Sequence, residues 1–245
     1  CAFLAGGILA WLGTFYAQSY QKMMTFISFI VGQSIMVVPL FFYLKIKNIP
    51  IQESIRFNAL RSTTVWYVIL FSMGLVILSD ELDKLIQVFI STPEYIVDLN
   101  QLLKPKSFFD GFLLVIAVVI LAPLGEEIVF RGFLQRILEK QWRDPTRAVL
   151  FTALIFAFIH MNPYWFFQIY ILGIFLGFLA LKTNSIIAPI ILHGLNNFIA
   201  LLLSFSDSND DSFYLWKGHV SPWILIFSLF SVVIGFKYVN QKNLN

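Results

Sequence analysis

Long apolar runs separated by short polar segments make up most of the chain. A helix needs about 17–25 apolar residues to cross the hydrocarbon core of a bilayer. The pattern predicts eight such helices: Ala2 to Gln18, Met23 to Leu44, Ser62 to Ser79, Phe108 to Gly125, two between Arg147 and Leu181 that divide at Asn162–Pro163, Thr183 to Ser206, and Ser221 to Phe236. We therefore expect an all-α, polytopic membrane helix bundle of about eight transmembrane helices, formed as a single domain over residues 1–245.

Two segments are too polar to cross the membrane. Ile51 to Leu60 is short and mixed in character, which predicts a helix on the cytoplasmic surface. Glu81 to Lys106 alternates charged with apolar residues, which is typical of an amphipathic segment that lies at the external membrane surface.

Composition agrees with a membrane protein. Apolar residues make up 58% of the chain and charged residues only 13%, with 27 phenylalanines, whereas a soluble domain carries roughly a quarter charged residues. The basic residues are scattered between apolar runs, which excludes a nucleic-acid partner and leaves the lipid bilayer as the surroundings. The one cysteine, Cys1, allows neither a disulfide framework nor a cysteine metal site within this sequence.

Lysine and arginine residues predict the orientation, because they gather in cytoplasmic loops. With eight spans, one side receives Lys45, Lys47, Arg56, Arg61, Arg131, Arg136, Lys140, Arg143, Arg147, Lys182, Lys237 and Lys242. The other side receives only Lys22, Lys84, Lys104, Lys106 and Lys217. We therefore expect a multi-pass protein of the plasma (inner) membrane with both termini in the cytoplasm.

Ionisable side chains at membrane depth are rare and usually functional. The chain has such groups at Glu126–Glu127, His160 and His193. At ~1.5 Å per residue, Glu126 lies about 21 Å from the basic residue that ends its helix, His160 about 20 Å and His193 about 16 Å. Three helices thus carry polar groups to a similar depth, which predicts a shared site.

Spacing within each helix predicts which side chains meet. Glu127 and Arg131 are four residues apart and share a helix face, so the guanidinium can neutralise this carboxylate. Glu126 points about 100° away and stays free to react. Asn197 shares a face with His193, and Phe156 lies one turn before His160, where its ring can orient the imidazole.

These residue types suit the hydrolysis of a peptide bond by an activated water. A carboxylate in a pocket of low dielectric constant is suited to act as a general base, and an imidazole can orient the water or protonate the leaving amine. An imidazole and an amide can stabilise an oxyanion. Glu126 with His160 fits the first role, and His193 with Asn197 the second. The chain has no G-x-S-x-G motif, which disfavours a serine nucleophile.

A metal ion is an open alternative. Two histidines and a carboxylate match a catalytic zinc set, which Glu126, His160 and His193 would supply. H-E-x-x-H is absent, and the ligands would come from three helices. The residues alone leave zinc and a metal-free water equally open. They also leave open an internal salt bridge at Glu127–Arg131 and interhelical hydrogen bonding at Asn197.

The same residues resemble the motifs of the CAAX protease and bacteriocin-processing family of intramembrane proteases, the type II CAAX prenyl endopeptidases. That family shows E-E-x-x-x-R, F-x-x-x-H and H-x-x-x-N on separate helices. Here they read Glu126 to Arg131, Phe156 to His160 and His193 to Asn197. The resemblance covers a core of about residues 108–205 and implies an eight-helix bundle around a cavity.

The resemblance also implies roles. Glu126 would be the catalytic base with His160 as its partner, His193 and Asn197 would form the oxyanion site, and Glu127 and Arg131 would shape the pocket. The expected substrate is a membrane-associated peptide or protein, possibly lipidated or cut near its C-terminus. Two other functions remain open: a proton-coupled transporter, and a non-catalytic scaffold or bacteriocin-immunity protein.

Overall fold

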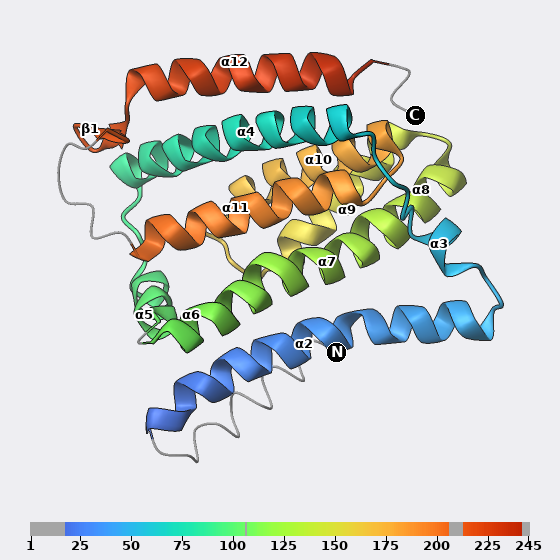
Figure 1. Cartoon of the computed structure of the whole chain (residues 1–245), viewed down its shortest axis with the longest axis horizontal. Coiled ribbons are helices and arrows are strands. Elements are labelled where there is room, and N and C mark those ends of the chain that lie inside the picture. Colours follow the sequence, from blue (N-terminus) through green and yellow to red (C-terminus); the bar gives the residue numbers. More distant parts are fainter. Residues whose placement is uncertain (1–17, 106, 206–212, 242–245) are drawn as a thin grey trace.

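The structure, a computed structural model, describes residues 18–105, 107–205 and 213–241. Residues 2–17 of the first expected span, together with Cys1, lie outside this part of the chain. Figure 1 shows the described helices running roughly along one direction, with α2 on one side of the bundle and α4 and α12 on the other. The architecture is an all-α helix bundle, as the apolar pattern predicts.

The elements follow one another with short connections. They are α2 (Gln18–Ile46), α3 (Ile51–Ser54), α4 (Ser62–Phe89), α5 (Glu94–Leu103), α6 (Phe108–Val115), the π-helical η1 (Ile116–Leu121), α7 (Ala122–Glu127), the π-helical η2 (Ile128–Leu134), α8 (Gln135–Trp142), α9 (Pro145–Ile159), α10 (Phe166–Thr183), α11 (Ile187–Phe205), β1 (Leu215–Trp216), β2 (His219–Val220) and α12 (Pro222–Val239).

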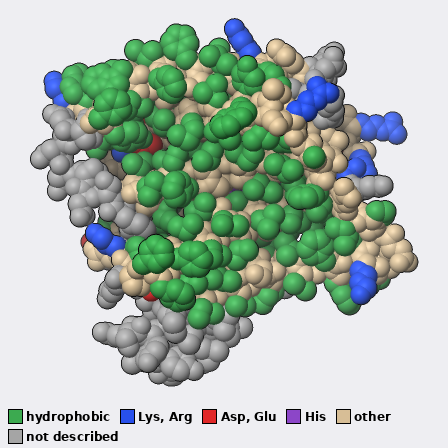
Figure 2. Space-filling view, viewed as in Figure 1, with side chains coloured by type: hydrophobic (Ala, Val, Ile, Leu, Met, Phe, Trp, Pro, Cys, Tyr) green, Lys and Arg blue, Asp and Glu red, His purple; other side chains and the backbone are tan. Residues whose placement is uncertain are grey.

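Four of these helical segments are long and apolar enough to cross a membrane: Ser62–Phe89, Phe108–Trp142, Phe166–Thr183 and Pro222–Val239. Three shorter apolar helices cover Ile30–Ile46, Pro145–Ile159 and Ile187–Leu203. Figure 2 shows hydrophobic side chains spread over the face of the molecule, with Lys and Arg towards its two ends. The chain is an integral membrane protein, whereas the expected count of eight transmembrane helices is not confirmed.

The third expected span is longer than its apolar pattern predicts. Helix α4 continues past Ser79 to Phe89, so the third expected span and the first part of the expected surface segment, from Glu81, form one continuous helix. Side-chain pairs four residues apart continue the helix: Lys84 donates to Asp80 at 3.3 Å, and Gln87 donates to Asp83 at 2.6 Å. The remainder of the expected surface segment contains α5, and the expected seventh span begins at Ile187 rather than Thr183.

The antiparallel hairpin β1–β2 packs against this extension of α4. Glu81 holds it with both carboxylate oxygens: Oε1 is 2.9 Å from Nδ1 of His219, and Oε2 accepts from the backbone N–H of Val220 at 2.7 Å. The same end of the bundle carries α5 (Figure 1). His219 therefore pairs with Glu81 in the hairpin contact and has a structural role there.

Two apolar clusters position the polar residues. The larger packs residues of α4, α9, α10 and α11 around Phe71, Phe156 and Leu192. The smaller packs Leu40 and Leu44 of α2 against Ile128 and Ile186. The long helix Phe108–Trp142 contributes to both clusters and carries Glu126 and Glu127 between them.

Candidate active site

The helix segment that carries both glutamates lies between two π-helical segments, η1 and η2. In η1 the N–H of Ala122 bonds to the carbonyl of Ala117, five residues earlier. Pro123 has no N–H, so the carbonyl of Val118 has no donor five residues later. π-Helical turns widen a helix locally and often occur at functional sites.

Asn197 of α11 provides the missing donor. Its Nδ2 donates to the Val118 carbonyl at 2.9 Å, and its Oδ1 accepts from Asn196 Nδ2 at 3.3 Å. Asn197 lies one turn after His193, as the spacing predicts. Its amide is nevertheless engaged with the long helix rather than directed at Glu126.

Glu126 lies between the two histidines. Its Oε2 is 3.9 Å from Nε2 of His160 and 3.8 Å from Nε2 of His193. Oε2 is buried and has no hydrogen-bond partner within the described residues. The His160 side chain is 29% exposed, against 12% for Glu126 and 5% for His193, so the cluster is most accessible at His160. The expected convergence of three helices on one place is found.

Each histidine is held through its other ring nitrogen. Nδ1 of His160 lies 2.6 Å from the carbonyl oxygen of Phe156. Nδ1 of His193 lies 2.8 Å from Oε1 of Glu127. A carbonyl and a carboxylate accept hydrogen bonds, so both Nδ1 atoms carry the proton, and a neutral ring then presents a lone pair at Nε2 towards Glu126.

Glu127 is bound on two sides. Its Oε1 accepts from Arg131 at 3.0 Å as well as from His193, and all three side chains are buried. The sequence predicts the Glu127–Arg131 pair. The bond from Glu127 to His193 is a further finding, and it makes Glu127 the group that orients this imidazole.

Phe156 of α9 packs among the charged groups. Its ring lies 4.5 Å from the ring of His160 and 5.8 Å from that of His193, both edge-to-face, and the Arg131 guanidinium lies 4.3 Å from its centre. The ring therefore contacts Arg131 and both imidazoles at once. The sequence predicts its contact with His160 only.

His160 caps the C-terminus of α9 instead of lying within a span. Met161 follows with a left-handed backbone, φ +49°. The side-chain oxygen of Asn162 then accepts from the backbone N–H groups of Tyr164 at 3.1 Å and Trp165 at 3.3 Å. Asp83 of α4 anchors this turn by accepting from the Trp165 indole at 3.2 Å.

Three polar residues of the same region are absent from the predicted site: the buried Gln135 and Arg56 and the partly buried Glu139. The sequence does carry a signal for Gln135 and Glu139. The four-residue spacing of Glu127 and Arg131 continues to Gln135 and Glu139, so all four lie along one face of the helix. No local spacing links this face to Arg56, which is 83 residues before Glu139.

The cluster as arranged does not fit tetrahedral zinc. Zinc binds nitrogen and oxygen ligands at about 2.0–2.1 Å, which places two tetrahedral ligands about 3.3 Å apart. The separations of 3.8 and 3.9 Å are larger. Within the described ranges, no three His, Cys, Asp or Glu side chains are grouped as a metal ion requires.

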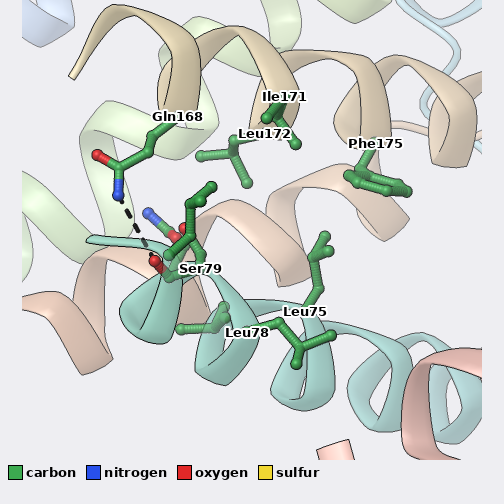
Figure 3. Close-up of a pocket in the computed structure, with 10 residues that line it drawn as sticks. Leu75, Leu78, Ser79, Gln168, Ile171, Leu172 and Phe175 are labelled. Atoms are coloured by element: carbon green, nitrogen blue, oxygen red, sulfur yellow. Dashed lines mark hydrogen bonds between the residues drawn. The ribbon is translucent and has the colours of Figure 1, made fainter. Parts of the chain in front are cut away.

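A small cavity of about 110 Å³ lies between α4, α10 and α11. Figure 3 shows Leu75, Leu78, Leu172 and Phe175 around it, with Gln168 donating to the Ser79 carbonyl at one side. None of the residues lining this cavity is Glu126, His160 or His193. The cavity and the glutamate–histidine cluster are therefore separate features.

Comparison with known proteins gives one match. Residues 108–199 match the family described as type II CAAX prenyl endopeptidase Rce1-like. No curated protein matched the chain, and neither did a solved structure. The matched segment contains all seven residues that the motifs single out, from Glu126 to Asn197, and confirms the resemblance seen in the sequence.

Proposed function

We propose that this chain, whose residues 108–199 carry a type II CAAX prenyl endopeptidase Rce1-like domain, is an endopeptidase that cleaves its substrate within the membrane. The observation that carries the proposal is the placement of Glu126 Oε2 between the Nε2 atoms of His160 and His193. A carboxylate oxygen with no protein hydrogen-bond partner, beside the Nε2 atoms of two imidazoles, is arranged to bind and activate a water molecule.

In the proposed reaction, Glu126 accepts a proton from this water as the water oxygen attacks the carbonyl carbon of the scissile peptide bond. The resulting tetrahedral intermediate then loses its amine, which leaves with the proton that Glu126 took from the water, delivered directly or relayed through Nε2 of His160. His160 suits this transfer because it is the most exposed member of the cluster.

His193 is proposed to stabilise the oxyanion. Glu127 holds the ring through Nδ1, and in this step a proton on Nε2 donates to the developing negative charge. The oxyanion role expected for Asn197 requires its amide to leave the Val118 carbonyl. We therefore propose that Asn197 fixes η1 beside the site.

The proposed substrate is a membrane-associated peptide or protein, with a lipidated one or one cut near its C-terminus as the narrower alternatives. The proposal keeps the expected location in the plasma membrane, eight spans and cytoplasmic termini. It uses no metal ion, because the cluster as arranged does not match zinc geometry.

The test is cleavage of a fluorogenic lipidated peptide by the purified protein in nanodiscs, with Glu126→Gln as the variant. Loss of the general base predicts a fall in kcat of about 10²–10⁴-fold. Folding should be retained, since Oε2 has no protein partner to lose. The matched control is Glu94→Gln in the first turn of α5, where the side chain is exposed.

Cleavage by Glu126→Gln at the rate of the unaltered protein would show that Glu126 is not the general base. An absence of cleavage by the unaltered protein on lipidated, unmodified and C-terminal peptides alike would contradict the proposed activity, and the scaffold or transporter reading would take its place.

A further inference from the structure

A column of buried polar side chains leads away from the candidate active site. It consists of Glu127, Arg131, Gln135 and Glu139, each four residues after the last, and it ends at Arg56. We call these five residues the polar column. Glu127, Arg131 and Gln135 are fully buried, and the Glu139 side chain is only 10% exposed.

The column has two hydrogen-bonded halves. In the first, Arg131 donates to Glu127, which also holds His193. In the second, Gln135 Nε2 donates to Glu139 Oε1 at 2.8 Å. Arg56 donates to both carboxylate oxygens of Glu139, the fork-like arrangement that fixes a guanidinium most firmly.

Helix α10 joins the two halves. Arg131 donates to the carbonyl of Gly173 at 3.2 Å, and Gln135 donates to the carbonyl of Gly177 at 3.1 Å, one turn further on. A Cβ atom at Gly177 would lie 2.8 Å from Oε1 of Gln135, so glycine permits this close approach. The side chains of Arg131 and Gln135 therefore share one rigid support.

The far end of the column is fixed to the loop before α4. Arg56 has a left-handed backbone, φ +54°, and its carbonyl accepts from the N–H of Ile186 at 3.0 Å. Nearby, Asn58 donates to the carbonyl of Asn184 at 2.6 Å. The loop is thus attached to the start of α11, the helix that carries His193.

Stability alone does not account for this arrangement. Burying an ion pair costs several kcal/mol per charge, and apolar residues of the same volume often give an equally stable fold. What a bonded column provides is fixed geometry, because each donor and acceptor restricts the position of the next. Its first member holds Nδ1 of His193.

We infer that Gln135 is a positioning residue for His193, and that the Arg56–Glu139 pair holds Gln135 in place. This inference rests on the proposed function for its effect on catalysis, but its effect on His193 is independent of any activity. Without the Gln135 amide, the link between Glu139 and the Gly177 carbonyl is lost, α8 shifts on α10, and the contact of Arg131 with Glu127 moves with it.

The test compares Gln135→Leu with Gln141→Leu, the same substitution at an exposed position of α8. Misplacing a catalytic group by about 1 Å costs roughly 10²-fold in rate. We expect kcat to fall at least about tenfold in Gln135→Leu with KM changed less than about threefold, and no change in Gln141→Leu. A rise in KM with kcat unchanged would overturn the inference.

A second measurement reads His193 directly. The chain has three histidines, so ¹⁵N-histidine labelling gives three pairs of ring-nitrogen signals, assigned with His160→Gln and His193→Gln. We expect the Nδ1 proton of His193 to exchange with water at least about tenfold faster in Gln135→Leu, with His219 unchanged. An unchanged His193 signal in a folded variant would overturn the inference, whether or not the protein cleaves peptides.

Glu139→Gln provides the same test with the side-chain volume preserved, should Gln135→Leu fail to fold. Neutralising Glu139 removes its ion pair with Arg56, and it should affect the His193 signal in the same direction. No effect of Glu139→Gln on either kcat or the signal would overturn the role given to the Arg56–Glu139 pair.

Discussion

The side-chain amide of Asn197 donates a 2.9 Å hydrogen bond to the backbone carbonyl of Val118. This bond joins α11 to the π-helical segment η1, at the carbonyl that Pro123 leaves without a helical donor. A proline within the long helix thus determines where α11, and with it His193, attaches beside Glu126.

Restoring the missing N–H should release this attachment. In Pro123→Ala the π-helical turn gains an N–H that can bond to the Val118 carbonyl in competition with the Asn197 amide. We expect peptide cleavage to fall at least about tenfold, because the turn that carries Glu126 rotates away from His193. The control is Pro222→Ala at the exposed first position of α12, where cleavage should not change. Equal rates for both variants would contradict this role of Pro123.

Glu127 should matter more for stability than Glu126. Glu127→Gln leaves the fully buried Arg131 without its closest counter-charge, which costs about 3–5 kcal/mol. Glu126→Gln removes no protein hydrogen bond at Oε2 and should cost less than about 1 kcal/mol. Thermal unfolding of both variants in the same detergent measures the difference. A more stable Glu127→Gln than Glu126→Gln would refute it.

Phe156 should support both folding and catalysis through its ring. Phe156→Leu removes the contacts with Arg131 and the two imidazoles and leaves space in the core, at a cost of about 1–3 kcal/mol. Phe158→Leu, two residues later and 62% exposed, is the matched control and should unfold at the same temperature as the unaltered protein. The same melting temperature for both variants would contradict the packing described here.

Chelation separates the water mechanism from a zinc mechanism. If water binds between Glu126 and the histidines without metal, cleavage should survive exhaustive treatment with a chelator, and added zinc should not increase it. Rates before and after dialysis against the chelator provide the measurement. If the chelator abolished activity and zinc restored it, the metal-free mechanism would be wrong and a zinc mechanism would take its place.

Within single helices the sequence predicts the site well. The four-residue spacing of Glu127 and Arg131, and of Phe156 and His160, corresponds to contacts in the structure, because a helix fixes which of its own residues share a face. Glu126, His160 and His193 were expected to meet because they lie at similar depths in the bilayer. Depth can be calculated from the number of residues to the end of each membrane-spanning helix.

Contacts between helices were harder to predict. The bond of Glu127 to His193, the bond of Asn197 to Val118, and the pairing of Glu139 with Arg56 depend on how each helix is rotated about its axis. Two π-helical segments change that rotation within the long helix, and residue spacing does not reveal them.

Helix α4 reaches well past its apolar part, and there Asp83 accepts from Trp165 in the turn after His160. Arg56, which also lies outside residues 108–199, donates hydrogen bonds to Glu139 at the far end of the polar column. The matched segment is therefore not a transplantable module. In a chimaera that places this segment between helices of another protein, the Trp165 indole and the Glu139 carboxylate would lose their partners. Such a chimaera must therefore also include Asp83 and Arg56.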